Sequence, residues 1–422
     1  MKVARLCLFM ALLFVPASVP AQPAPKTNEY SLPPDKLEKA HDYARARNWL
    51  HFAGEIYGVA VVVVILAFGI AAKFRDWAEA ASHRRFIQAL IFIPLLLLAN
   101  DLLTIPLGIY GQHLELAFNQ SVQSWPSWLW DWTKGEFLAL LVAIPLGFIL
   151  YAIIRRSPGR WWFYFWLASI PILFAVAFVE PFIIEPLFFQ FEPLAKHHPA
   201  LVNDLEKVVA RGGLEIPPDR MFEMKASEKL NSLNAYVSGI GASKRVVVWD
   251  TALQKLTTPE TLFIFGHEMG HYVLGHVRNS IILGAAFGLL LLYAGYRAIH
   301  AVLNRWGERW RIRGVSDWAS LPALLLIASI FGFFSEPVAN AYSRWQEHQA
   351  DIYGLEVIHG IVENPAAVAA HSFQVLGEES LDEPDPSAFI EFWAYSHPSI
   401  AERVAFSATY NPWATGTPKY VK

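Results

Sequence analysis

The sequence is poor in cysteine and in charge. Its single cysteine, Cys7, lies in the first apolar run, so neither a disulfide framework nor a cysteine-based metal site is possible. Any metal must therefore be held by histidine, aspartate or glutamate. Only 17% of the residues are charged, against about 25% in an average soluble protein. A formal net charge of −3 argues against nucleic acid as a partner.

Hydrophobic residues make up 54% of the chain, and the mean hydropathy is +0.31. Crossing a lipid bilayer takes about 20 mostly apolar residues. Six stretches approach that length: residues 56–72, 86–110, 137–154, 161–184, 280–302 and 318–339. Trp161, Trp162 and Trp318 stand at span ends, where interfacial aromatic residues are common. The sequence thus predicts a mainly α-helical, polytopic membrane protein.

The N-terminus has the pattern of an export signal. Lys2 and Arg5 precede an apolar run of ten residues, and small residues follow up to Ala21. Such a run is too short to span a bilayer comfortably and suits a signal peptide. We interpret residues 1–21 as a signal peptide or anchor, and residues 22–54 as a linker or helix.

Loop charges predict the orientation of the chain. Three alternate loops are basic, and cytoplasmic loops carry such an excess. Their cationic residues are Lys73, Arg75, Arg84 and Arg85; Arg155, Arg156 and Arg160; and Arg305, Arg309, Arg311 and Arg313. The polar segments 185–278 and 341–422 then lie on the opposite side. In a bacterial inner membrane that side is the periplasm.

The two polar segments are predicted to form one split domain. Four spans within residues 55–184 precede the first segment, and two spans within 279–340 separate it from the second. Residues 201–211 have the pattern of an amphipathic helix. Residues 234–240 and 244–249 predict a hairpin that turns at Gly241-Ala242-Ser243, so the domain includes a small sheet.

The motif His267-Glu268-Met269-Gly270-His271 carries the chemistry. Histidines four residues apart lie on one helical face, so both imidazoles can bind one ion. Thr257 or Thr258 as cap, with Pro259 and Glu260, predicts where this helix begins.

A catalytic zinc usually has three protein ligands and one open position. In a metzincin, glycine and histidine would stand where this chain has Leu274 and Val277, so that class is excluded. His276 is one residue out of place, and we interpret it as a helix-surface residue.

Glu347 is the better candidate for the third ligand. Asp351 lies one helical turn further and could accept a hydrogen bond from a zinc-bound imidazole. His348 is the alternative ligand, although it points about 100° away from Glu347 on a helix. One Zn²⁺ per chain would activate a water molecule, with Glu268 as the general base.

At these residues the chain resembles the type I CAAX prenyl proteases, which are membrane zinc peptidases with a glutamate ligand. The resemblance runs from about residue 56 to 403. Its pieces are Asp101-Leu102-Leu103-Thr104-Ile105-Pro106, residues 186–194, Asn234-Ala235-Tyr236, the HExxH helix, residues 347–351 and Ser396-His397-Pro398. The resemblance implies helices that enclose an intramembrane chamber, with a zincin-like domain capping it.

The resemblance also implies roles for individual residues. Asn234, Ala235 and Tyr236 would bind the backbone of a peptide substrate held along the hairpin edge. His397 would donate to the oxyanion, and Arg403 would support the site. The substrate would be a peptide or protein, in the family a prenylated one. Family members in eukaryotes have seven spans and a cytosolic site, whereas loop charges here favour envelope or damaged membrane proteins as substrates.

Two other functions remain open from the sequence. The six spans and Asp101, which lies inside one of them, allow a transporter or channel, although we interpret Asp101, together with Asn100, as chamber-lining or structural. However, the chain shows no internal repeat of the kind that many transporters have. A non-catalytic membrane chaperone is the second alternative, but it would not need Glu268. The sequence does not indicate the oligomeric state.

Overall fold

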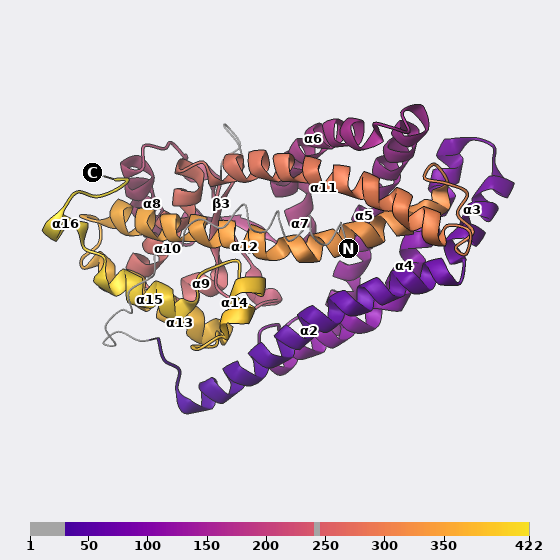
Figure 1. Cartoon of the computed structure of the whole chain (residues 1–422). Coiled ribbons are helices and arrows are strands. Elements are labelled where there is room, and N and C mark those ends of the chain that lie inside the picture. The colour runs from indigo at the N-terminus through magenta and orange to yellow at the C-terminus, as the bar shows by residue number, and fades with distance from the viewer. Residues whose placement is uncertain (1–29, 240–244, 422) are drawn as a thin grey trace.

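The computed structural model describes residues 30–239 and 245–421, and the molecule is elongated (Figure 1). The predicted signal at residues 1–21 and the turn Gly241-Ala242-Ser243 lie outside the described residues. Long helices run the length of the molecule. A domain of short helices and strands occupies one end, and the helix α3 lies at the other, together with the loop between α11 and α12.

Five helices are long and apolar enough to cross a membrane. They are α2 (Pro34–Ala67), α4 (Arg85–Ala117), α5 (Trp125–Arg156), α11 (His276–Trp306) and α12 (Leu321–Ile358). One further segment passes the same test only when its two parts are taken together, and it is bent by 43° at the break. It consists of α6 (Trp161–Val179), the π-helix η1 (Glu180–Ile184) and α7 (Glu185–Phe188). Pro181 lacks an N–H to continue the helix, which explains a break here. The prediction of a polytopic helical membrane protein is confirmed.

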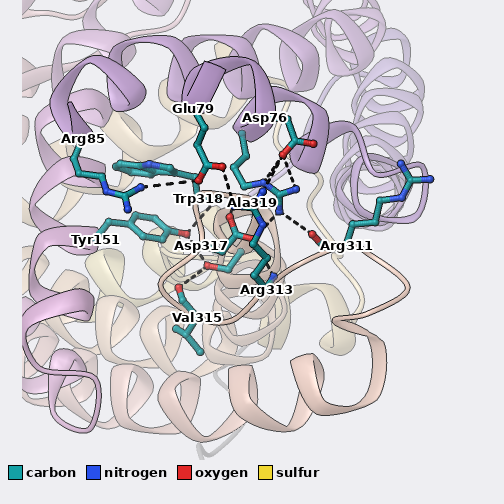
Figure 2. Close-up of polar contacts among 12 residues, drawn as sticks. Asp76, Glu79, Arg85, Tyr151, Arg311, Arg313, Val315, Asp317, Trp318 and Ala319 are labelled. Atoms are coloured by element: carbon teal, nitrogen blue, oxygen red, sulfur yellow. Dashed lines mark hydrogen bonds and ion pairs between the residues drawn. The ribbon is translucent and has the colours of Figure 1, made fainter. Parts of the chain in front are cut away.

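The end that carries the basic loops is fastened by buried polar contacts (Figure 2). Arg75 of α3 (Ile70–Ala81) pairs with Asp317 at 2.7 Å, and both side chains are almost fully buried. Arg75 also donates to the Arg311 carbonyl at 2.8 Å. Asp317 accepts from the backbone of Arg313 and caps the short helix η6 (Trp318–Ser320). These contacts tie α3 to the loop between α11 and α12.

Trp318 corrects one sequence interpretation. Only 1% of its surface is exposed, and its indole donates to Gln88 Oε1 at 3.1 Å. Arg155 stacks on its ring, 4.5 Å from the centroid. Trp161 is likewise buried, at 3% exposed. Neither tryptophan contacts the lipid interface, because the surrounding helices cover both.

The polar domain contains a small mixed sheet with the strand order β1-β2-β4-β3. Its strands are β1 (Phe191–Pro193), β2 (Met221–Met224), β3 (Ala235–Ser238) and β4 (Arg245–Trp249). β2 and β4 are parallel, while β3 pairs antiparallel with β4, as the predicted hairpin requires. Three helices accompany the sheet: α8 (Pro199–Arg211), α9 (Asp250–Lys255) and α10 (Thr258–Val273). The predicted amphipathic helix is confirmed as α8.

The C-terminal segment completes this domain. It forms α13 (Pro365–Ser380), α14 (Ala388–Ala394), α15 (Ile400–Thr409) and α16 (Pro412–Thr415). One core cluster joins Val248 of β4, Phe263 of α10, Tyr353 of α12 and Phe373 of α13. The two polar segments therefore share one core. α12 is one continuous helix that runs from the membrane into that core, where its last residues, Ala350–Ile358, are all buried.

Candidate metal centre

The helix α10 begins with a capping box. Thr257 and Glu260 satisfy each other's backbone N–H groups, and Pro259 lies in the first turn, as the sequence predicted. Ten of its sixteen residues are buried, all of them between Glu260 and Gly270, so packing fixes the position of this part of the helix. His267 and His271, four residues apart, place their Nε2 atoms 3.2 Å from each other.

Glu347 on α12 completes the group. Its Oε2 lies 3.2 Å from His267 Nε2, and its Oε1 lies 3.3 Å from His271 Nε2. These three side chains could hold one metal ion. A tetrahedral ion with bonds of about 2.0–2.1 Å requires ligand atoms about 3.3 Å apart. The distance between the two nitrogens fits such an ion, and each nitrogen has one oxygen of the Glu347 carboxylate at a similar distance.

Two glycines let α10 and α12 approach closely enough for this geometry. A Cβ atom on Gly354 would lie 2.9 Å from the His267 backbone nitrogen. A Cβ atom on Gly266 would lie 2.7 Å from Val357 Cγ1. Contact between the helices is thus backbone to backbone beside His267, and it brings Glu347 within reach of the histidines.

Two polar residues, Asp351 and Arg403, contact His267 at its Nδ1 atom. Its Nδ1 lies 2.8 Å from Asp351 Oδ1, as predicted for an orienting carboxylate. Arg403 binds the same carboxylate with two nitrogens, at 2.6 and 3.0 Å, and lies 3.6 Å from Glu347. Burial raises the pKa of Asp351, but Arg403 and His267 outweigh it, so the pKa lies below its usual range. Asp351 therefore stays anionic and fixes the proton on His267 Nδ1.

Glu347 is also held as an anion. Burial alone would raise the pKa of its carboxyl, but His267 and His271 bring that pKa well below the usual range. Its Oε2 is buried and has no hydrogen-bond partner among the residues that the structure describes. A buried carboxylate oxygen without a donor suits a site for a cation.

Glu268 and His397 border the open side of the group. Glu268 Oε1 lies 3.9 Å from His267 Nε2, and burial raises the pKa of this carboxyl. His397 Nε2 lies 3.4 Å from Glu347 Oε1, and 58% of the His397 side chain is exposed. Both side chains therefore lie next to the group of His267, His271 and Glu347.

Asn234, Ala235 and Tyr236 lie at one edge of the sheet rather than in the histidine cluster. β3 is the last strand in the sheet order, and Asn234 just before it is exposed. The Ala235 side chain is buried, and the Tyr236 hydroxyl donates to Glu185 at 2.5 Å. Any contact of these residues with a peptide would therefore come chiefly from the strand backbone and Asn234.

His276 corrects a second interpretation. Instead of lying on a helix surface, it is 3% exposed, and its Nδ1 lies 3.1 Å from His271 Nδ1. The sequence feature that could have indicated this position is Gly275, which adopts the left-handed conformation at φ 70° and separates α10 from α11. His348 packs on Phe406 at 4.5 Å between ring centroids and does not join the metal group.

Known proteins are similar to this chain over most of its length. Residues 196–409 match the profile of peptidase family M48, and residues 18–190 match that of the CAAX prenyl protease N-terminal region with its five membrane helices. An uncharacterized metalloprotease of Bacillus subtilis, YhfN, is 38% identical over 88% of this chain and 85% of its own. The CAAX prenyl protease 1 homolog of Arabidopsis thaliana is 24% identical over 90% and 89%.

The chain belongs to peptidase family M48. Its fold matches the crystal structure of S. mikatae Ste24p with a TM-score of 0.77, at 21% identity and with 93% of each chain covered. The resemblance stated from the sequence is confirmed. The family assigns the chain as a membrane metalloprotease, and the His267, His271 and Glu347 group provides a place for the metal.

Proposed function

We propose that this protein is a zinc endopeptidase that cleaves extended polypeptides at the membrane surface. The observation that carries the proposal is the ligand geometry, in which two imidazole nitrogens lie 3.2 Å apart and each lies 3.2–3.3 Å from one oxygen of the same carboxylate. Two imidazoles, one carboxylate and an open fourth position favour zinc over magnesium or calcium, which prefer oxygen ligands.

Bound zinc would supply a water of lowered pKa and polarise the scissile carbonyl. Glu268 would take a proton from that water and deliver it to the leaving amine. Its position beside His267, on the open side of the ligand group, suits this role. Because burial raises the pKa of Glu268, its carboxylate is a stronger base than an exposed one.

His397 would donate a hydrogen bond to the developing oxyanion. Its Nε2 reaches the metal group from the exposed side, while its Nδ1 contacts Ser396 Oγ at 2.9 Å. Arg403 is buried behind the ligands and bound to Asp351, so we assign it an orienting role. His397 would thus act on the ligand group from its exposed side and Arg403 from its buried side.

A peptide substrate would add to the sheet as a further strand beside β3. Trp249 N donates to the Asn234 carbonyl at 3.0 Å, so residues 234 and 249 form a hydrogen-bonded antiparallel pair. Hydrogen-bonding direction alternates along such a strand. The N–H and C=O groups of Ala235 and Val237 therefore point away from β4. They can bind an extended peptide regardless of its side chains.

The substrate source follows from the orientation. The helix α3 and the loop between α11 and α12 lie at one end of the molecule, and α10, which carries His267 and His271, lies towards the other (Figure 1). This arrangement favours a periplasmic site in a bacterial inner membrane. We therefore favour envelope or damaged membrane proteins as substrates. Relatives named CAAX prenyl protease 1 favour prenylated peptides as the second candidate. Tags at Trp310 and Ala414 test the orientation: periplasmic labelling at Trp310 with cytoplasmic labelling at Ala414 would reverse it.

Metal analysis and cleavage of a quenched peptide library test the chemistry, in detergent, for wild type and Glu268→Gln. We expect about one zinc per chain in both, with cleavage only by wild type. His267→Ala and Glu347→Ala should lose the zinc. Full turnover by Glu268→Gln would refute the mechanism. Absence of zinc and of cleavage from the wild type would instead favour a transporter or a non-catalytic chaperone.

A further inference from the structure

The break between α10 and α11 turns His276 back toward the metal group. On an uninterrupted helix, a residue five positions after His271 would lie about 140° around the axis and point elsewhere. Gly275, with φ 70°, ends the regular helix, and α11 begins directly at His276. The two imidazole rings consequently meet edge to face, with centroids 5.0 Å apart.

The ligand role of His271 determines which of its two ring nitrogens carries the proton. Its Nε2 faces His267 and Glu347, so a metal bound there needs the lone pair of that nitrogen. The proton of the neutral ring must then be on Nδ1, which lies 3.1 Å from His276 Nδ1. His276 Nδ1 is therefore the acceptor. The reverse arrangement, with His276 as donor, would move the His271 proton to Nε2 and block the metal.

The remaining nitrogen of His276 is consistent with this assignment. Its Nε2 must carry the proton, and it is buried without a hydrogen-bond partner among residues 30–239 and 245–421. Burying an N–H without an acceptor is unfavourable. A side chain that only filled space could avoid this cost by being apolar. The histidine is thus better explained by what its Nδ1 does than by packing.

The backbone of His276 is fixed as well. Gln346 donates to the His276 carbonyl at 3.2 Å, and Ser280 Oγ donates to Gln346 Oε1 at 3.2 Å. Gln346 directly precedes the ligand Glu347. The position of His276 is thereby tied to the helix that supplies the third ligand.

We propose that His276 is a positioning residue that accepts a hydrogen bond from His271 Nδ1 and so fixes the tautomer and ring orientation of that metal ligand. This inference rests on the zinc site proposed above. His276 serves His271 as Asp351 serves His267, but as an uncharged acceptor. Loss of such a partner weakens metal binding by about 10–100-fold.

The test compares two substitutions in the full chain in detergent. His276→Phe keeps a flat ring but removes the acceptor, whereas the amide oxygen of His276→Asn can replace Nδ1. His300→Phe is the matched control, because His300 is exposed on the same helix. The readouts are zinc affinity by competition with a chelator, the visible spectrum of the cobalt-substituted protein, and the melting temperature.

We expect His276→Phe to bind zinc about 10–100-fold more weakly and to alter the cobalt spectrum. His276→Asn should recover most of the affinity, and His300→Phe should match wild type. Wild-type zinc affinity and an unchanged spectrum for His276→Phe would overturn the inference, as would equal weakening by Phe and Asn. If the wild type itself binds no zinc, the proposed function fails first, and the two failures are thus distinguished.

Discussion

The close approach of α10 and α12 predicts that Gly354→Ala damages the metal site without touching a ligand. The new methyl group would lie 2.9 Å from the His267 backbone nitrogen and 3.1 Å from its Cα. These atoms belong to a rigid, buried helix and cannot rotate away. Ordinary contact begins at about 3.4 Å. The helices must therefore separate by about 0.5 Å at His267.

That separation exceeds the tolerance of metal ligation and reaches the limit for catalytic geometry. Metal–ligand distances hold within about 0.2 Å, and productive catalytic geometry within about 0.5 Å. Overpacking of this kind costs about 1–3 kcal/mol, from which the better helix propensity of alanine returns at most about 1 kcal/mol. We expect weaker zinc binding, a lower melting temperature and a fall in kcat/KM that approaches 100-fold per ångström of displacement.

Gly332→Ala is the matched control for this prediction. Gly332 lies on the same helix α12, and an added Cβ would meet nothing within 4 Å. Its melting temperature should be unchanged or slightly raised, because alanine is the better helix former. Zinc affinity is measured by chelator competition and turnover with a quenched peptide. If Gly354→Ala equals Gly332→Ala in both, close packing does not set the ligand geometry.

Two further predictions concern stability. Burial raises the pKa of Glu260, but hydrogen bonds from Thr257 and His371 outweigh it and bring the pKa below the usual value. The contribution of the Glu260 carboxylate to the free energy of unfolding is complete above the unfolded pKa of about 4.3, and it is lost as the pH falls through the lower pKa of the folded state. At pH 7, Glu260→Gln should therefore be less stable than wild type by about 1 kcal/mol in the free energy of unfolding, and this difference should disappear on acidification. A stability difference that does not change with pH would contradict the prediction. Asp317→Asn removes the buried one of the two carboxylates that Arg75 contacts and leaves only the exposed Asp76. It should cost about 1.5–3 kcal/mol in thermal unfolding, against a smaller loss for Arg75→Met with Asp317→Leu. A loss below about 1 kcal/mol would refute it.

Local patterns in the sequence were enough to predict much of this molecule. Apolar length predicted the spans, the capping pattern at Thr257 predicted the start of α10, and helical spacing placed His267 beside His271. Asp351 was found because one helical turn separates it from Glu347, and it indeed contacts His267. Each of these features depends on residues close together in the chain.

Features that depend on packing between distant segments could not be read in the same way. Trp318 has the composition of an interfacial residue, but it is enclosed by helices more than 150 residues away in sequence, through Gln88 and Tyr151. His276 was misplaced because an uninterrupted helix was assumed. One glycine at positive φ changed the direction of its side chain, and glycine also occurs within helices without breaking them.

The position of β3 at the edge of the described sheet allows a last prediction. Proline substitutions made separately at two adjacent positions of this strand should have different effects. Val237 directs its N–H away from β4, whereas Tyr236 directs its N–H into the ladder, by the alternation that starts from the Asn234–Trp249 pair. Proline is tolerated in an edge strand only where the lost N–H faces outward. Val237→Pro should therefore keep the melting temperature and zinc content of wild type, while Tyr236→Pro should lose stability.

Turnover distinguishes whether the outward N–H binds substrate. One lost hydrogen bond is worth about 0.5–1.5 kcal/mol, or roughly 2- to 13-fold in kcat/KM, and the proline ring would further obstruct an added strand. Val237→Ala, which keeps the N–H, controls for the side chain. A folded, zinc-bound Val237→Pro that cleaves peptides at the rate of Val237→Ala would show that substrates do not pair with β3. A loss of turnover in Val237→Pro but not in Val237→Ala would indicate that the peptide backbone lies along this edge, because the backbone N–H that the proline removes points outward from it.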